Sequence, residues 1–178
     1  MSRETVSIRP VRDADMAAIT AINGQSVATG TASFELEPPD LDEMRRRRDT
    51  LLAGGFPYLV AEAEEGILGY AYAGPYRPRP AYRATVEDSI YLAAAAQGRG
   101  IGRLLLAALI EAAEAGGFRQ MVAVIGDSQH QASIRLHAAL GFRLVGILEN
   151  VGFKHGRWLD SVLMQRSLGA GADEPPVS

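Results

Sequence analysis

The chain has 178 residues, of which 47% are hydrophobic and 22% are charged, as in one ordinary globular domain. Its formal net charge of −3, from 18 basic and 21 acidic residues, argues against nucleic acid as the main partner. The sequence contains no cysteine, which excludes disulfides, thiolate metal ligands and a cysteine nucleophile.

The longest fully apolar runs are short and lie at residues 90–96 and 104–110. They fall well below the about 18 residues that a membrane span needs, and residues 1–4 lack the apolar core of a signal peptide. We therefore expect a cytoplasmic protein with no membrane partner. We expect a single domain over residues 1–168, followed by a flexible tail at 169–178, where two prolines interrupt a segment without apolar periodicity.

In the first half of the chain, apolar spacing and capping residues predict two helices and three strands. Asp13 and Asp40 are suitable N-cap residues, and Gly54 and Gly55 end the second helix. The predicted segments are a strand at residues 6–11, a helix at 13–23, a long loop at 24–39, a helix at 40–53 and a hairpin of strands at 58–63 and 67–73.

In the second half, the strongest signal is a helix whose apolar residues recur at three- and four-residue intervals until Gly116. The predicted segments are a loop at residues 74–83, a strand at 85–92, that helix at 99–115, a strand at 120–125, a helix at 132–140, and strands at 143–148 and 159–167. The result is a mixed α/β domain of six or seven strands and about four helices.

A strand that runs through a glycine-rich turn into the best helix is the most informative motif. Glycines allow close backbone approach, and the first amides of a helix have no internal partner, so this unit predicts a phosphate site. Arg103 stands where a dinucleotide-binding fingerprint needs glycine, and no Gly-Lys-Ser/Thr motif is present. The alternative is a turn that serves packing alone. The predicted phosphate-binding residues are Gln97, Gly98, Arg99, Gly100, Ile101, Gly102 and Arg103.

This turn resembles the pyrophosphate loop of the GCN5-related N-acetyltransferases (GNATs), which bind acetyl-coenzyme A. The resemblance extends from about Ile8 to Leu168 and is closest to the phosphinothricin and methionine sulfoximine acetyltransferase branch. Matching pieces are found at residues 31–35, 70–77, 85–87, 122–126, 133–142 and 154–160. The resemblance implies an acyltransferase fold with a central, twisted, mostly antiparallel sheet of six to seven strands flanked by about four helices.

For the cofactor, the backbone of Ile90, Tyr91 and Leu92 could pair with the pantetheine arm as an added strand does. The resemblance implies the same, and it implies that this strand separates from residues 120–125. It also places His130 and Ser133 beside the cofactor. Relatives generally carry asparagine where this chain has His130. No metal is expected, because His130 and His137 have no carboxylate at a suitable spacing other than Asp127.

Without a cysteine, direct attack of an amine on acetyl-coenzyme A is the simplest route. The resemblance assigns the role of general base to Glu87, in the Thr-Val-Glu sequence. His137 is the candidate that protonates the leaving thiolate or hydrogen bonds to its sulfur. The alternatives are a structural or solvent-facing glutamate and a histidine packed near the core.

The loop before Glu87 is basic and aromatic, which suits an anionic, amino-acid-like acceptor. Together with the resemblance, it predicts substrate contacts for Phe34, Glu35, Arg77, Arg79, Tyr82 and Arg83. A solvated loop with scattered arginines is the alternative, and we interpret the arginines at 45–48 as solvated surface. The resemblance also implies a homodimer, with Trp158 near the interface. Two other functions remain open: a non-catalytic acetyl-coenzyme A sensor and an acetyltransferase of protein amines.

Overall fold

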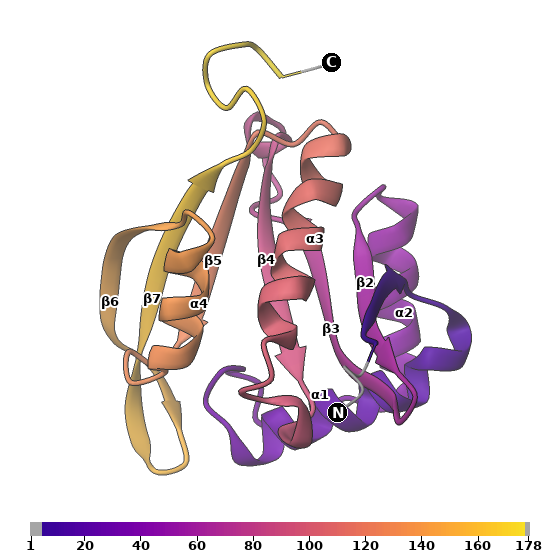
Figure 1. The fold of residues 1–178 in the computed structure, drawn as a ribbon. Helices are drawn as coiled ribbons and strands as arrows, with labels where there is room; N and C mark the ends of the chain where they lie inside the picture. Colours follow the sequence, from indigo (N-terminus) through magenta and orange to yellow (C-terminus); the bar gives the residue numbers. More distant parts are fainter. Residues whose placement is uncertain (1–4, 177–178) are drawn as a thin grey trace.

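The computed structural model describes residues 5–176 and shows one seven-stranded sheet in the order β1-β2-β3-β4-β5-β7-β6 (Figure 1). All neighbouring strands are antiparallel except β4 and β5, which are parallel. The mixed, mostly antiparallel fold predicted from the sequence is therefore confirmed. The strands are β1 (Ser7–Pro10), β2 (Tyr58–Ala63), β3 (Gly66–Pro75), β4 (Thr85–Leu92), β5 (Gln120–Gly126), β6 (Arg143–Lys154) and β7 (Arg157–Ser167).

Within residues 5–176, four α-helices cover the two faces of the sheet. The helices are α1 (Met16–Thr29), α2 (Leu41–Ala53), α3 (Ile101–Ala115) and α4 (Gln131–Ala139). The apolar stripe of α3 packs on one face in the larger hydrophobic cluster, and Figure 1 shows α4 beside it on the same face. Side chains of α1 and α2 pack against Tyr58, Val60 and Tyr70 in a second cluster on the opposite face. Each face of the sheet is thus buried by a different pair of helices.

Helix α1 is longer than predicted, and the prediction that a loop begins at residue 24 was wrong. Gly24 lies inside the helix, which ends only at Thr29. Ile22, Asn23 and Val27 are all buried, and the Asn23 amide donates a 3.0 Å hydrogen bond to the Tyr70 hydroxyl. This tertiary packing outweighs the cost of one glycine in a helix, about 1 kcal/mol. The connection to α2 is consequently shorter than expected.

The β6–β7 hairpin is also longer than predicted. The strand was expected to end at Leu148, but it continues to Lys154. The register shifts between Leu148 and Gly152, and Asn150 lies between them with φ 55. A bulge with a residue in the left-handed region absorbs the turn-like sequence without ending the strand.

The chain termini lie only partly within the described residues. Residues 1–4, where no signal peptide was expected, and residues 177–178 of the predicted tail fall outside them. In the described part of that tail, the carbonyl of Pro175 accepts a 3.2 Å hydrogen bond from Arg119. Its flexibility stays a prediction. Among the helices of residues 5–176, none has the length and apolar character to span a membrane.

Candidate active site

Strands β4 and β5 separate halfway along their length. Their register runs from Thr85 opposite Gln120 to Asp88 opposite Ala123, and no pairing follows. Beyond that point β4 continues to Leu92 beside β3 alone, and β5 continues to Gly126 beside β7 alone. The separation agrees with the one that the family resemblance implied. It leaves backbone groups of β4 available to a ligand in the slot.

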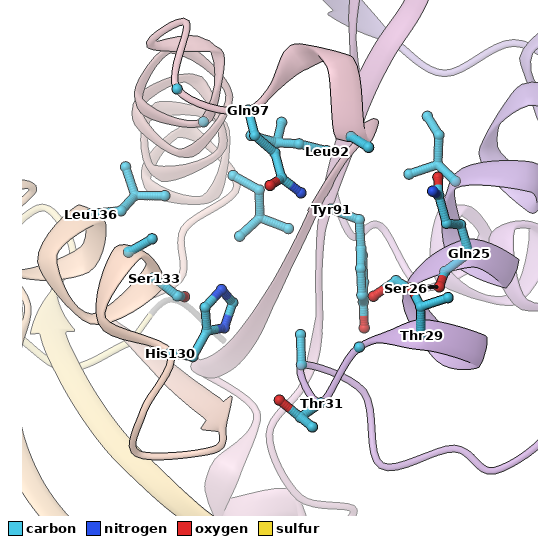
Figure 2. Close-up of a pocket in the computed structure, with 18 of the residues that line it drawn as sticks. Gln25, Ser26, Thr29, Thr31, Tyr91, Leu92, Gln97, His130, Ser133 and Leu136 are labelled. Carbon is cyan, nitrogen blue, oxygen red and sulfur yellow. Dashed lines mark hydrogen bonds between the residues drawn. The ribbon is translucent and has the colours of Figure 1, made fainter. Parts of the chain in front are cut away.

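A cavity of about 560 Å³ begins at this slot and reaches the glycine-rich turn. Figure 2 shows it between the start of α4, which carries His130 and Ser133, and the end of α1. Ten of the predicted cofactor residues line it: Ile90, Tyr91, Leu92, Gln97, Gly98, Gly100, Gly102, Arg103, His130 and Ser133.

Two predicted cofactor residues are not among its lining residues. The Arg99 side chain pairs with Glu65 at 3.0 Å on the surface. The Ile101 side chain is buried in the core beneath α3, although its residue opens the helix.

The turn before α3 has the geometry of an anion site. Gly98 and Gly100 have φ of 75 and 80, a region that side chains other than glycine rarely adopt. No described side chain caps the start of α3, whose first amides have no partner within the helix. These amides, the positive end of the helix dipole and Arg103 at the cavity favour a bound phosphate.

At the point where the strands separate lies a small second cavity of about 60 Å³. His137, 2% exposed, lines it and holds both of its ring nitrogens in hydrogen bonds. Nε2 lies 3.0 Å from Oδ2 of Asp88, and Nδ1 lies 2.7 Å from the carbonyl of Ser133. Both partners are acceptors, so an imidazolium satisfies both at once.

The charge state of His137 follows from these contacts. Burial is the largest influence and disfavours the charged ring, but the hydrogen bond and charge of Asp88 together with the Ser133 carbonyl outweigh it and raise the pKa of His137. The other carboxylate oxygen of Asp88 is buried without a hydrogen-bond partner among the described residues. The structure therefore places His137 at the slot, with its nitrogens already engaged by protein acceptors.

His130 also lies at this junction, because it lines both cavities. Its ring points into the larger cavity in Figure 2. Burial lowers the pKa of His130, against the opposing charge of Asp127, so the ring is mainly neutral at pH 7. No group of three or more potential metal ligands occurs within residues 5–176.

Glu87 lies next to Asp88 but on the opposite face of the sheet, because successive side chains of a strand alternate. It is half-buried and lines neither cavity. Burial, aided by the charge of Asp88, raises the pKa of Glu87. Its charge in turn contributes to raising the pKa values of Tyr72 and Tyr91, so the three side chains are close enough to interact. A raised pKa suits a carboxylate that must accept a proton.

An array of tyrosines on this face was not singled out from the sequence. Tyr58 stacks on Tyr72 with ring centroids 5.1 Å apart, and Tyr70 stacks on Tyr91 at 5.2 Å. The signal was present, since Tyr70 and Tyr72 alternate along one predicted strand and two further predicted strands carry one tyrosine each, Tyr58 and Tyr91. It could have been found by aligning those strands, because cross-strand neighbours share a face. Together with Glu87, these rings form an aromatic surface with polar groups at its edge, which we call the tyrosine wall.

The predicted acceptor residues occupy two segments of the molecule. Phe34 and Glu35 lie in the connection between α1 and α2, and Arg47 of α2 donates a 2.7 Å hydrogen bond to Glu35. Arg77, Arg79, Tyr82 and Arg83 are exposed on the loop between β3 and β4 and line neither cavity. That loop leaves β3 beside Glu87, which is in register with Gly74.

The interpretation of the arginines at 45–48 as solvated surface was wrong for Arg48. Arg48 is buried and pairs with Asp13 at 2.9 Å and with Asp49 at 2.7 Å. Arg47 bridges Glu35 and Glu43. Long arginine stems can lie along apolar surface while their guanidinium groups reach carboxylates.

Comparison with known proteins relates this geometry to a family. Residues 8–163 match the family model described as an acetyltransferase (GNAT) domain. The chain is 56% identical over 171 residues to phosphinothricin N-acetyltransferase of Alcaligenes faecalis, an overlap of 96% of this chain and 87% of the relative. It is 42% identical over 172 residues to L-methionine sulfoximine/L-methionine sulfone acetyltransferase of Pseudomonas aeruginosa, an overlap of 96% and 99%.

A solved structure is similar over almost the whole chain. It is a GNAT superfamily phosphinothricin acetyltransferase from Sinorhizobium meliloti in complex with AcCoA, and it superposes with a TM-score of 0.94 at 49% sequence identity. The match covers 98% of this chain and 94% of that protein. Fold and sequence therefore agree on one family.

Proposed function

Because the chain belongs to the GNAT acetyltransferase family, we propose that it transfers the acetyl group of acetyl-coenzyme A to the amine of a small amino acid of the phosphinothricin, methionine sulfoximine or methionine sulfone type. The observation that carries this proposal is the slot between β4 and β5, which opens into a cavity that ends at the uncapped start of α3. The names of relatives that match more than nine-tenths of the chain supply the acceptor class.

In this proposal the larger cavity holds coenzyme A. The amides around Gly98, Gly100 and Gly102 and the guanidinium of Arg103 bind the pyrophosphate. Where β4 has lost its pairing with β5, the backbone of Ile90–Leu92 is free to pair with the pantetheine arm. That arrangement delivers the thioester to the point where the strands separate.

The acceptor reaches the thioester from the face that carries Glu87. A free α-ammonium has a pKa of about 7.7–8, so roughly a tenth of it is already neutral near pH 7, and Glu87 removes one proton from the remainder. The neutral amine nitrogen forms a bond to the acetyl carbon, and the bond from that carbon to sulfur breaks. The nitrogen then loses its second proton, and the leaving thiolate takes up one proton. The raised pKa of Glu87 is consistent with a carboxylate that accepts this proton.

The leaving thiolate must be protonated or its charge screened. We assign to His137 the screening of this charge, and not the donation of a proton. Since both of its N–H groups point to protein acceptors, the imidazolium acts through its positive charge near the small cavity. His130 faces the cofactor cavity, where its ring can donate one hydrogen bond to the pantetheine arm, the role that the family resemblance implies for an asparagine at this position.

Recognition of the acceptor is assigned to two groups of residues. Arg77, Arg79 and Arg83 provide guanidinium groups for a carboxylate or phosphinate, and Tyr82 lies beside them. Phe34 and Glu35 form the opposite wall. The cationic loop favours a small anionic acceptor over a cationic peptide N-terminus.

A homodimer is part of this proposal. The β6–β7 hairpin exposes seven large apolar side chains, which the monomer leaves uncovered. Exposed apolar patches of this extent are typical of protein interfaces. The residues are Leu144, Val145, Ile147, Leu148, Val151, Phe153 and Trp158. A cytoplasmic location, with which the absence of cysteine is compatible, also belongs to the proposal.

The decisive experiment follows release of free coenzyme A thiol from acetyl-coenzyme A. Methionine sulfoximine, methionine sulfone and phosphinothricin should each accelerate release, and the same compounds with the amine blocked should not. Binding of acetyl-coenzyme A without turnover on any amine would instead support the sensor alternative. Faster turnover on a peptide N-terminus than on these amino acids would support acetylation of protein amines.

A further inference from the structure

Lys154, the last residue of β6, carries a buried ammonium that the proposed mechanism does not use. The residue is 4% exposed, and its Nζ donates a 2.8 Å hydrogen bond to the carbonyl of Ser33. No carboxylate lies within ion-pairing distance of it among the described residues; Glu35 attracts it only at longer range. Burial lowers the pKa of Lys154. Burial of a cation without a paired anion costs free energy of folding, so a buried ammonium at Lys154 calls for an explanation.

Its partner belongs to a short segment, residues 30–35, which we call the strap. The strap follows α1 and is bound to the tip of the β6–β7 hairpin at several points. The carbonyl of Gly30 accepts a 3.2 Å hydrogen bond from His155. The hydroxyl of Thr31 donates a 2.9 Å bond to Asp127, which also accepts a 2.6 Å bond from Arg157.

Phe34 adds a steric contact between the strap and the sheet. A Cβ atom at Gly126 would lie 2.8 Å from the Phe34 ring, and one at Gly152 would lie 2.5 Å from it. The ring therefore rests against the backbone of both β5 and β6, where only glycine leaves enough space. The strap is fitted closely to the hairpin.

The two ends of the strap face different parts of the site. Gly30, Thr31 and Ala32 line the cofactor cavity. Ser33 hydrogen bonds through its side chain to Tyr91, and Glu35 contributes to raising the pKa values of Tyr72 and Tyr91. The end that Lys154 holds therefore borders the tyrosine wall and Glu87, whereas Thr31 and His155 hold the end toward the cofactor.

We propose that Lys154 is a positioning residue for acetyl transfer: by binding the Ser33 carbonyl it fixes the acceptor end of the strap, and so places Phe34 and Glu35 against the bound amine. This inference rests on the proposed function, since it assumes that the acceptor binds beside Glu87. Lys154 touches neither substrate. Its effect is confined to the acceptor because the cofactor end of the strap keeps its own two hydrogen bonds.

The test compares Lys154→Met, which removes the charge and the donor, with Arg143→Met. Arg143 is exposed on the same strand and binds Gln165, far along β6 from the strap. Misplacement of reacting groups by about 1 Å can cost about a hundredfold, so we expect kcat/KM for methionine sulfoximine to fall at least about tenfold in Lys154→Met. The KM for acetyl-coenzyme A should change less than about twofold, and Arg143→Met should behave as wild type.

Hydrogen exchange and the conservative variant separate positioning from general destabilisation. Amides of residues 31–35 should exchange faster in Lys154→Met, while those of β4 and α3 stay protected. Lys154→Arg, which retains a charged donor, should lose less activity than Lys154→Met. If Lys154→Met does not fold, Lys154→Arg takes its place in the comparison. The inference would be overturned if Lys154→Met left the KM for the amine and kcat unchanged. It would also be overturned if the variant lost kcat/KM equally for the amine and for acetyl-coenzyme A. No activity of the wild type toward any amine would instead overturn the proposed function.

Discussion

Glu87 and Asp88 are neighbours in sequence, but they differ in the face of the sheet that they occupy, in burial and in pairing. Alternation along β4 sends Glu87 toward the tyrosines and Asp88 toward His137. Asp88 is fully buried and paired, whereas Glu87 is half-buried and has no hydrogen-bond partner that is evident among the described residues. A carboxylate with a raised pKa and oxygens not engaged in hydrogen bonds is suited to proton transfer. A carboxylate that is paired is suited to holding two elements together.

We predict that Glu87→Gln lowers kcat by a factor of about 10² to 10⁴, the usual contribution of a general base. Because burial raises the pKa of Glu87, wild-type activity should decline as the pH falls through that raised pKa, and the glutamine variant should lack this acidic limb. Steady-state rates from pH 5 to 9 check both. Full activity of Glu87→Gln at pH 7 would remove Glu87 from the mechanism.

His137 gives a stability prediction that depends on pH. Its pKa is raised in the folded protein, so the stabilisation it provides is fully present below the unfolded pKa of about 6.5 and is lost as the pH rises through the folded pKa. His137→Gln leaves the Asp88 carboxylate buried without a cationic partner, which should cost about 3 kcal/mol at pH 5.5. Urea unfolding of both proteins should show a smaller difference at pH 9, and a difference that grows with pH would contradict this account.

At the scale of elements, the start of α3 illustrates how a helix end becomes a site. The helix begins after a glycine in the left-handed region, and its first amides have no side-chain cap among the described residues. Most helices begin at a serine, threonine, aspartate or asparagine in extended backbone, whose side chain accepts a hydrogen bond from a first-turn amide, and a left-handed glycine offers no such acceptor. The bare terminus therefore suits a ligand that supplies the missing acceptors.

This argument predicts different outcomes for two equivalent glycine substitutions. Gly100 and Gly55 both have positive φ and open space where a Cβ atom would stand, so Gly100→Ala and Gly55→Ala should each lose about 1 kcal/mol of stability. Only Gly100→Ala should also raise the KM for acetyl-coenzyme A, by about tenfold, as expected when one hydrogen bond to a charged group is lost. Thermal melts and saturation kinetics measure the two effects. Equal KM values in both variants would argue against a phosphate at this turn.

The strap and the β6–β7 hairpin show how elements distant in sequence combine. The hairpin tip supplies Lys154, His155 and Arg157, each of which holds the strap directly or through Asp127. The same hairpin carries the exposed apolar side chains, among them Trp158 at 61% exposure. One element thus connects the proposed dimer surface with the wall of the proposed acceptor site.

For the whole molecule, the uncovered hairpin predicts self-association. Phe153 and Trp158 pack edge to face with their centroids 5.2 Å apart, and both are more than half exposed. Trp158→Glu should convert a dimer to a monomer, because a buried interface cannot accommodate an unpaired charge. Leu52→Glu is the control, since Leu52 is exposed on α2, which packs against β2 toward the other end of the sheet. Sedimentation velocity at micromolar concentration distinguishes the forms, and a monomeric wild type would contradict the prediction.

Much of the fold could be predicted from the sequence because local signals agree with it. The side chain of Asp40 accepts a hydrogen bond from the Glu43 amide, as its capping position predicts, and β4 has the predicted bounds. The errors arose where tertiary contacts overrode local rules. Buried neighbours carried α1 through Gly24, and a bulge at Asn150 prolonged β6.

In the candidate site, too, some features follow from local sequence and others only from tertiary contacts. The sequence alone determined the glycine-rich turn before α3 and the order of strands and helices around it, because φ preferences, capping and apolar periodicity act between residues only a few positions apart. Only the tertiary structure decided that His137 pairs with Asp88, that Arg47 holds Glu35 and that Lys154 holds Ser33. These contacts join distant segments, and the energy that selects them comes from burial and from charges brought together by the completed fold.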